Sequence, residues 1–162
     1  MSSFKDDFRQ VWHKPDNGIA RIIIINVAIF ALANILGLFT LNISEYLTLS
    51  SSLSELAWEP WTIFTHFFTH LGFGHIFWNM ITLYWFGEIF IQFLGNRKMI
   101  ALYILGGLAG GLAYLIGMNL IPTYSKVIGI ALGASAAVNA IVVGSATLMP
   151  DYKIHLFLIG PV

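Results

Sequence analysis

The sequence lacks cysteine altogether and is poor in charged residues. Among its 162 residues, only 10% are Asp, Glu, Lys or Arg. Without cysteine the chain has no disulfide bonds and no thiolate metal sites, and its redox compartment stays undetermined. Lys and Arg together equal Asp and Glu, at 8 each, so there is no basic excess of the kind that nucleic-acid binding requires. Because a soluble domain carries about 25% charged residues, we infer that lipid is the main solvent of this chain.

Apolar residues make up 57% of the chain and gather in four long segments. A helix needs roughly 20 apolar residues to cross the hydrocarbon core of a membrane. We therefore expect an all-α polytopic membrane protein whose spans cover about residues 22–41, 74–93, 99–118 and 133–149. The first run is longer than the roughly 7 to 15 residues of a signal peptide's apolar region, which favours an uncleaved anchor.

The remaining residues form three polar connections. Residues 1–21 are expected to be an N-terminal arm, residues 42–73 a loop at the membrane surface, and residues 150–162 a connector. Four spans place seven of the eight basic residues on one side, namely Lys5, Arg9, Lys14, Arg21, Arg97, Lys98 and Lys153. By the positive-inside rule that side, which includes the N-terminus, is cytosolic. The bias and the compact loops suit a bacterial inner membrane.

Glycine and proline shape the fourth apolar segment. Gly129 and Gly133 interrupt it and Pro150 ends it, and both residue types disfavour a helix interior. The helix proper is therefore predicted from about Ser135 to Leu148. The irregular backbone ahead of it would lie at membrane depth, where protein or a water-filled cavity must cover it.

Three of the five histidines, His66, His70 and His75, lie in a single stretch that ends at Asn79. Polar side chains without partners cost roughly 1 to 3 kcal/mol each in an apolar setting, so this stretch is expected to have a use. His75 and Asn79 are four residues apart and share a helical face. Two N–H donors that point the same way are what an oxyanion hole requires.

Ser135 follows Gly133 and Ala134 at the predicted start of the fourth helix. Free backbone N–H groups and the helix dipole stabilise negative charge there. A serine in these surroundings suggests acyl transfer, provided that a base takes its proton. Because the second and fourth spans both start on the extracytosolic side, Ser135, His75 and Asn79 are expected to meet.

Together these residues resemble the rhomboid family of intramembrane serine proteases over roughly residues 58–150. The matching features are Phe64-Thr65-His66, His70, His75-Ile76-Phe77-Trp78-Asn79 and Gly133-Ala134-Ser135-Ala136. The resemblance implies a rhomboid-like helical bundle with four of six core spans present. It implies that Ser135 is the nucleophile, with His75, Asn79 and the backbone N–H of Ser135 as oxyanion donors. His70 and Gly133 would have structural or gating roles.

The resemblance also implies what the protein acts on. Substrates would be transmembrane proteins, cut near the extracytosolic end of a membrane helix, and no metal or cofactor would be needed. The sequence departs from the family at two points. Ala136 stands where the family commonly has glycine. The family's base is a histidine on the sixth span, and neither His13 nor His155 can be assigned to it, since both lie on the predicted cytosolic side. We therefore expect a fragment that ends before the fifth span and is inactive by itself; a natural four-span protein is the alternative.

Each feature also has a structural interpretation. His66 and His70 can be packing or capping residues. His75 and Asn79 can form a hydrogen bond between helices, and the small residues around Ser135 can allow two helices to pack closely. A zinc site at the three histidines is disfavoured because no carboxylate lies near them. For the whole chain, the alternatives to a protease are a non-catalytic rhomboid-like protein that binds membrane clients and a small transporter or channel subunit. Glu88, inside the second span, receives no role.

Overall fold

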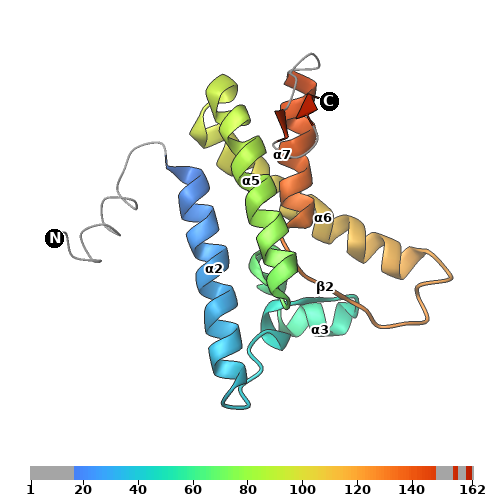
Figure 1. Cartoon of the computed structure of the whole chain (residues 1–162). Coiled ribbons are helices and arrows are strands. Elements are labelled where there is room, and N and C mark those ends of the chain that lie inside the picture. The colour runs from blue at the N-terminus through green and yellow to red at the C-terminus, as the bar shows by residue number, and fades with distance from the viewer. Residues whose placement is uncertain (1–16, 149–154, 157–159, 162) are drawn as a thin grey trace.

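The computed structural model describes residues 17–148, 155–156 and 160–161 (Figure 1). Four long helices dominate these residues: α2 (Gly18–Gly37), α5 (Phe73–Leu94), α6 (Asn96–Leu120) and α7 (Ser135–Leu148). The prediction of an all-α membrane bundle is thus confirmed. Most of the predicted arm and connector lies outside the described residues.

The predicted loop at 42–73 is folded into short elements. In chain order they are η1 (Glu45–Leu47), β1 (Leu49–Ser50), α3 (Leu53–Trp58), α4 (Thr62–Thr65) and η2 (His66–Phe68). The two-residue strand β1 pairs antiparallel with β2 (Ile130–Ala131), which precedes α7. A second antiparallel pair joins β3 (His155–Leu156) and β4 (Gly160–Pro161). The pairing of β1 with β2 ties the loop to the segment that leads into α7.

α2 lies four residues closer to the N-terminus than the span expected at 22–41. Its first turn is held by the backbone N–H of Gly18, which donates to Oδ1 of Asn96 at 2.9 Å. The last residues of the predicted arm are therefore helical. The helix ends at Gly37 because glycine is a poor helix former, and the chain then turns through Thr40, whose φ is 66°.

By length and composition, α2 and α6 can cross a membrane, with mean hydropathies of 2.3 and 2.0 over the most apolar window. α5 has 22 residues and α7 has 14. α7 begins at Ser135, directly after an irregular backbone that includes Gly133 with φ of 101°. This start agrees with the helix that the glycine pattern predicts.

A buried hydrogen-bond chain connects α2, α6 and η2. Asn26 is fully buried and donates from Nδ2 to the hydroxyl of Tyr103 at 3.1 Å and to the carbonyl of Ile22 at 2.8 Å. The Tyr103 hydroxyl donates to the carbonyl of Phe67 at 3.3 Å. Because buried polar groups require such partners, this chain accounts for the amide nitrogen of an asparagine inside the first apolar run, while its Oδ1 has no hydrogen-bond partner among the described residues.

Gly106 and Gly110 of α6 face α7. A Cβ on Gly106 would lie 2.5 Å from Cβ of Ala140, and one on Gly110 would meet Cβ of Ala136. The absent side chains allow the two backbones to approach closely, as small residues do between membrane helices. Figure 1 shows α7 crossing α6 at a steep angle near this contact.

Gly107 and Gly111 of α6 instead face the loop at residues 42–73, which carries His66 and His70 and is called the histidine-containing loop below. A Cβ on Gly107 would lie 2.6 Å from Cγ of Phe67, and one on Gly111 would lie 2.7 Å from Cε1 of His66. Both partner side chains are buried. The neighbouring pairs of glycines thus serve two different contacts of one helix.

We predict that Gly107→Ala lowers the free energy of unfolding by about 1 to 3 kcal/mol, the usual cost of overpacking a filled core. The reason is that the added methyl group overlaps the buried Phe67 ring. Gly117→Ala on the same helix is the matched control, because a Cβ there meets nothing within 4 Å. Thermal unfolding of both variants in a mild detergent, followed by circular dichroism, measures the difference. Equal stability of the two variants would contradict the close contact.

Candidate active site

The segment from His66 to His70 is packed inside the protein. His66 and His70 are only 4% and 1% exposed. Nδ1 of His66 is hydrogen-bonded to the carbonyl of Thr62 at 3.0 Å. The Phe67 ring lies edge-on to His66, with 5.3 Å between ring centroids. Both histidines are therefore held in place by their surroundings.

These two histidines also hold the backbone that precedes Ser135. The N–H of Gly133 donates to the carbonyl of His66 at 2.9 Å. The N–H of Ala134 donates to Nε2 of His70 at 3.2 Å, in a buried setting. Ser135, the first residue of α7, therefore directly follows two residues whose backbone N–H groups are both hydrogen-bonded to the loop.

Gly133 provides the space for His75. A Cβ on Gly133 would lie 2.6 Å from Nε2 of the His75 imidazole. The φ of Gly133 is 101°, a region that glycine adopts readily and other residues avoid. Both its conformation and its missing side chain are needed for the imidazole to lie against this backbone.

An open pocket of about 370 Å³ lies between α5 and α7. The α5 residues Gly74, His75, Trp78, Asn79 and Thr82 line one side, and the α7 residues Ser135, Val138 and Asn139 line the other. The structure thus brings together Ser135, His75 and Asn79, the three side chains that the sequence singles out. Ser135 and His75 are exposed to the pocket, whereas Asn79 is 8% exposed.

The side chain of Asn79 is oriented by its own helix. Its Nδ2 donates to the carbonyl of His75 at 2.8 Å. Because a carboxamide nitrogen carries two hydrogens, one of them remains available to a ligand in the pocket. The helix thereby fixes the direction of a donor that lies almost buried at the pocket wall.

Five further residues of the pocket are not identified by sequence reasoning as site residues, and three of them have a polar group in the side chain: Trp78, Thr82 and Asn139. Asn139 lies four residues after Ser135 on α7, and Thr82 lies three after Asn79 on α5. Residues with these spacings share a helical face. This spacing in the sequence could have identified Asn139 and Thr82 as candidate site residues.

Ala136, which departs from the glycine common in the family, does not line the pocket. It packs on Gly110 of α6, where the missing side chain of the glycine leaves room for the alanine methyl group. The departure therefore affects a helix contact and leaves the pocket lining unchanged.

The imidazoles of His70 and His75 lie close together, with ring centroids 5.0 Å apart. Among the described residues, no group of three or more His, Asp or Glu side chains is arranged to hold a metal ion. Burial, and secondarily the nearby His75, lowers the pKa of His70 from 6.5 to about 4. Burial also lowers the pKa of His66. A neutral His70 can accept the hydrogen bond from Ala134, and a doubly protonated one cannot.

Glu88, the acidic residue inside α5, is exposed and does not line this pocket.

Comparison with known protein families matches residues 57–162 to the Rhomboid domain. The chain is 36% identical over 111 residues to the RHOMBOID-like protein 12, mitochondrial, of Arabidopsis thaliana, covering 62% of this chain and 33% of that protein. It is 29% identical over 150 residues to the Rhomboid protein 1, mitochondrial, of Saccharomyces cerevisiae, covering 89% and 40%. The human Presenilin-associated rhomboid-like protein, mitochondrial, is 24% identical over 159 residues, covering 96% and 40%. The chain spans about a third to a half of the length of the curated relatives it matches.

We predict that protonation of His70 lowers the stability of the protein as the pH drops from 6.5 to about 4, and that this group contributes no further loss below that pH. The unfolded chain binds a proton at His70 near pH 6.5, whereas the folded protein resists it until about pH 4, so acid favours unfolding in this window. His70→Gln retains a hydrogen-bond acceptor but cannot be protonated, and should flatten the profile.

Thermal unfolding across this pH range measures the effect. His75→Gln is the control, since it removes a neighbouring imidazole and leaves the acceptor of the Ala134 N–H in place. A contribution from His66 in the same direction should remain in both variants, because its pKa is lowered as well. An unchanged profile for His70→Gln would show that His70 does not govern the acid sensitivity.

Proposed function

This chain belongs to the rhomboid family, and on that premise we propose that it forms the nucleophile and oxyanion-hole part of an intramembrane serine endopeptidase. One observation carries the proposal: Ser135, His75 and Asn79 come from two helices and line a single pocket. A structural role for the pair His75 and Asn79 as a bond between helices is less well supported, because Asn79 donates to its own helix.

The proposed reaction is acyl transfer. The hydroxyl oxygen of Ser135 attacks the carbonyl carbon of a substrate peptide bond and loses its proton to a base. Negative charge then develops on the carbonyl oxygen, where His75, Asn79 and the backbone N–H of Ser135 donate hydrogen bonds. Collapse of this intermediate breaks the C–N bond, and water hydrolyses the acyl-enzyme.

The proton acceptor is proposed to come from a histidine outside these 162 residues. His66 and His70 are buried and hold the backbone of Gly133 and Ala134, and His75 is assigned to the oxyanion hole. The chain spans about a third to a half of the length of its curated relatives. We therefore place the base on a later span of a longer protein.

The proposed substrate is a transmembrane protein. The pocket lies where α5 and α7 begin, which is the end of the bundle predicted to face away from the cytosol. A substrate helix that unwinds at that end would present a peptide carbonyl to Ser135. The proposed cut therefore lies near the extracytosolic end of the substrate's membrane helix.

We predict that a fluorophosphonate probe labels the full-length protein at Ser135 and that Ser135→Ala abolishes the labelling. The matched control is Ser145→Ala on the same helix, because Ser145 is 3% exposed and its hydroxyl donates to the carbonyl of Phe86. In-gel fluorescence of membranes that carry each variant measures the result. Labelling that persists in Ser135→Ala would remove the nucleophile assignment. A protein that fails to label and yet retains membrane clients would favour the non-catalytic alternative.

We further predict that His75→Ala and Asn79→Ala each lower kcat by about 10² to 10³, the usual cost of losing one oxyanion donor. Asn34→Ala is the matched control for Asn79→Ala. Asn34 likewise donates from Nδ2 to the carbonyl four residues earlier, but on the exposed side of α2. Cleavage of a fluorescent transmembrane peptide in liposomes gives kcat for each. Equal losses in Asn34→Ala and Asn79→Ala would mean that Asn79 acts only through helix stability.

A further inference from the structure

A second concave surface lies on the bundle outside the candidate active site. It is a groove of about 510 Å³ between α2, the loop and α6. Much of its wall is apolar and consists of Ile25 and Ile29 of α2, Phe64 of the loop, and Ile100 and Ile104 of α6. Arg21 lines it as well. We call it the α2–α6 groove. None of its lining residues belongs to the pocket of Ser135.

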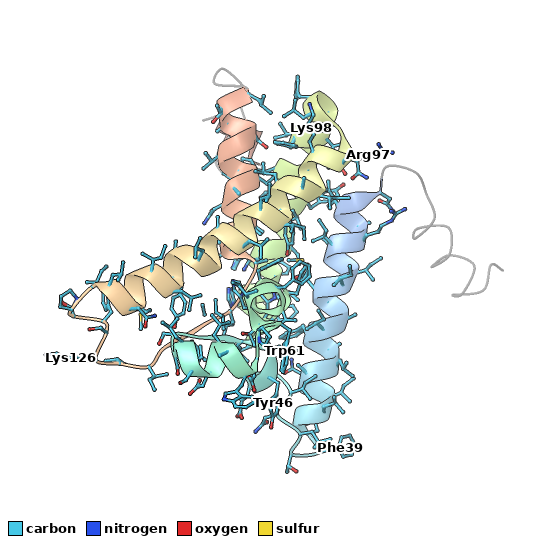
Figure 2. The ribbon with its side chains drawn as sticks, turned by 180° about the vertical axis from the view of Figure 1, so that it is seen from behind. Phe39, Tyr46, Trp61, Arg97, Lys98 and Lys126 are labelled. Carbon is cyan, nitrogen blue, oxygen red and sulfur yellow. The ribbon has the colours of Figure 1, made fainter. Side chains whose placement is uncertain are left out.

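One end of the α2–α6 groove is basic. Arg21 lies at the start of α2, close to Gly18, which is bonded to Asn96 at the start of α6. Arg97 lies one helical turn before Ile100 and on the same face of α6 as Ile104, given the spacings of three and seven residues. Figure 2 shows Arg97 at the end of α6 that lies beside the start of α2. Arg21 thus lines the groove, and Arg97 lies beside the same end of it without belonging to its lining.

The α2 residues that line the groove extend over roughly the depth of one leaflet. From Arg21 to Ile29, α2 rises about 12 Å, at 1.5 Å per residue, and half of a hydrocarbon core is about 15 Å thick. An acyl chain in this groove would lie along the isoleucines while its headgroup stays at the level of the arginines. Basic pockets between membrane helices attract anionic headgroups, particularly on the cytosolic side. The positive-inside rule predicts that this end of the bundle is cytosolic.

We propose that the α2–α6 groove binds an anionic phospholipid, with one acyl chain along Ile25, Ile29, Ile100 and Ile104 and the headgroup phosphate at Arg21 and Arg97. The proposal rests on charge complementarity at one end of an apolar groove and does not depend on the proteolytic activity. The adjacent Lys98 is about 100° away from Arg97 around α6, so it faces away from the groove.

The experiment compares two phospholipids that have identical acyl chains. Purified full-length protein in a neutral detergent is titrated with phosphatidylglycerol or phosphatidylcholine, and bound lipid is counted by native mass spectrometry. Phosphatidylglycerol should bind more tightly. Arg21→Gln and Arg97→Gln should each weaken phosphatidylglycerol about five-fold, the usual contribution of one basic residue. They should weaken phosphatidylcholine less, because its choline ammonium offsets the charge of its phosphate.

Two charge-matched controls separate a site from diffuse attraction. Lys98→Gln removes the same charge beside Arg97, and Lys126→Gln removes one in the loop that follows the far end of α6, where Figure 2 places it. Neither should change the preference for phosphatidylglycerol. An equal loss in Lys98→Gln and Arg97→Gln would overturn the proposal, as would equal binding of the two lipids by the unaltered protein.

A third variant tests the apolar part of the site. Ile25→Trp places a larger side chain in the groove and should weaken both lipids, while circular dichroism confirms that the helices remain. Unchanged binding of phosphatidylglycerol by the folded Ile25→Trp protein would also overturn the proposal. If this variant does not fold, the comparison of Arg97→Gln with Lys98→Gln decides by itself.

Discussion

The hydrogen bonds from Gly133 and Ala134 to the histidine-containing loop are the constraint on which the candidate site depends. The carbonyl of His66 and Nε2 of His70 accept from these two successive backbone N–H groups. They connect a loop at the start of α5 with the start of α7, so Ser135 is placed relative to His75. Without them, the irregular backbone ahead of α7 would have unpaired N–H groups in an apolar environment, which is costly.

The glycines of α6 make that arrangement sterically possible. Gly106 and Gly110 accept α7, while Gly107 and Gly111 accept Phe67 and His66 of the loop. One helix therefore brings its two neighbours close enough for their backbones to bond to each other. Larger residues on either face of α6 would separate the loop from α7.

The two concave surfaces lie on different parts of the bundle and differ in chemistry. The pocket of Ser135 is open and lined by His75, Asn79, Thr82 and Asn139. The α2–α6 groove is lined mainly by isoleucine and phenylalanine, and its polar end is basic. The proposed occupant of the first is a peptide bond, and that of the second is a lipid. Their separation means that a substitution in one surface can be assayed without altering the lining of the other.

The sequence by itself determined the apolar helices, because the length and hydropathy of a run decide whether it can cross a membrane. It also identified the start of α7 from Gly133, and the pairing of His75 with Asn79 from their spacing. Tertiary structure decided the rest. Three features depend on contacts between residues far apart in the chain. They are the hydrogen bond from the Ala134 N–H to His70, the position of Asn139 in the pocket, and the α2–α6 groove. Local periodicity carries no information about such contacts, because packing between helices sets them.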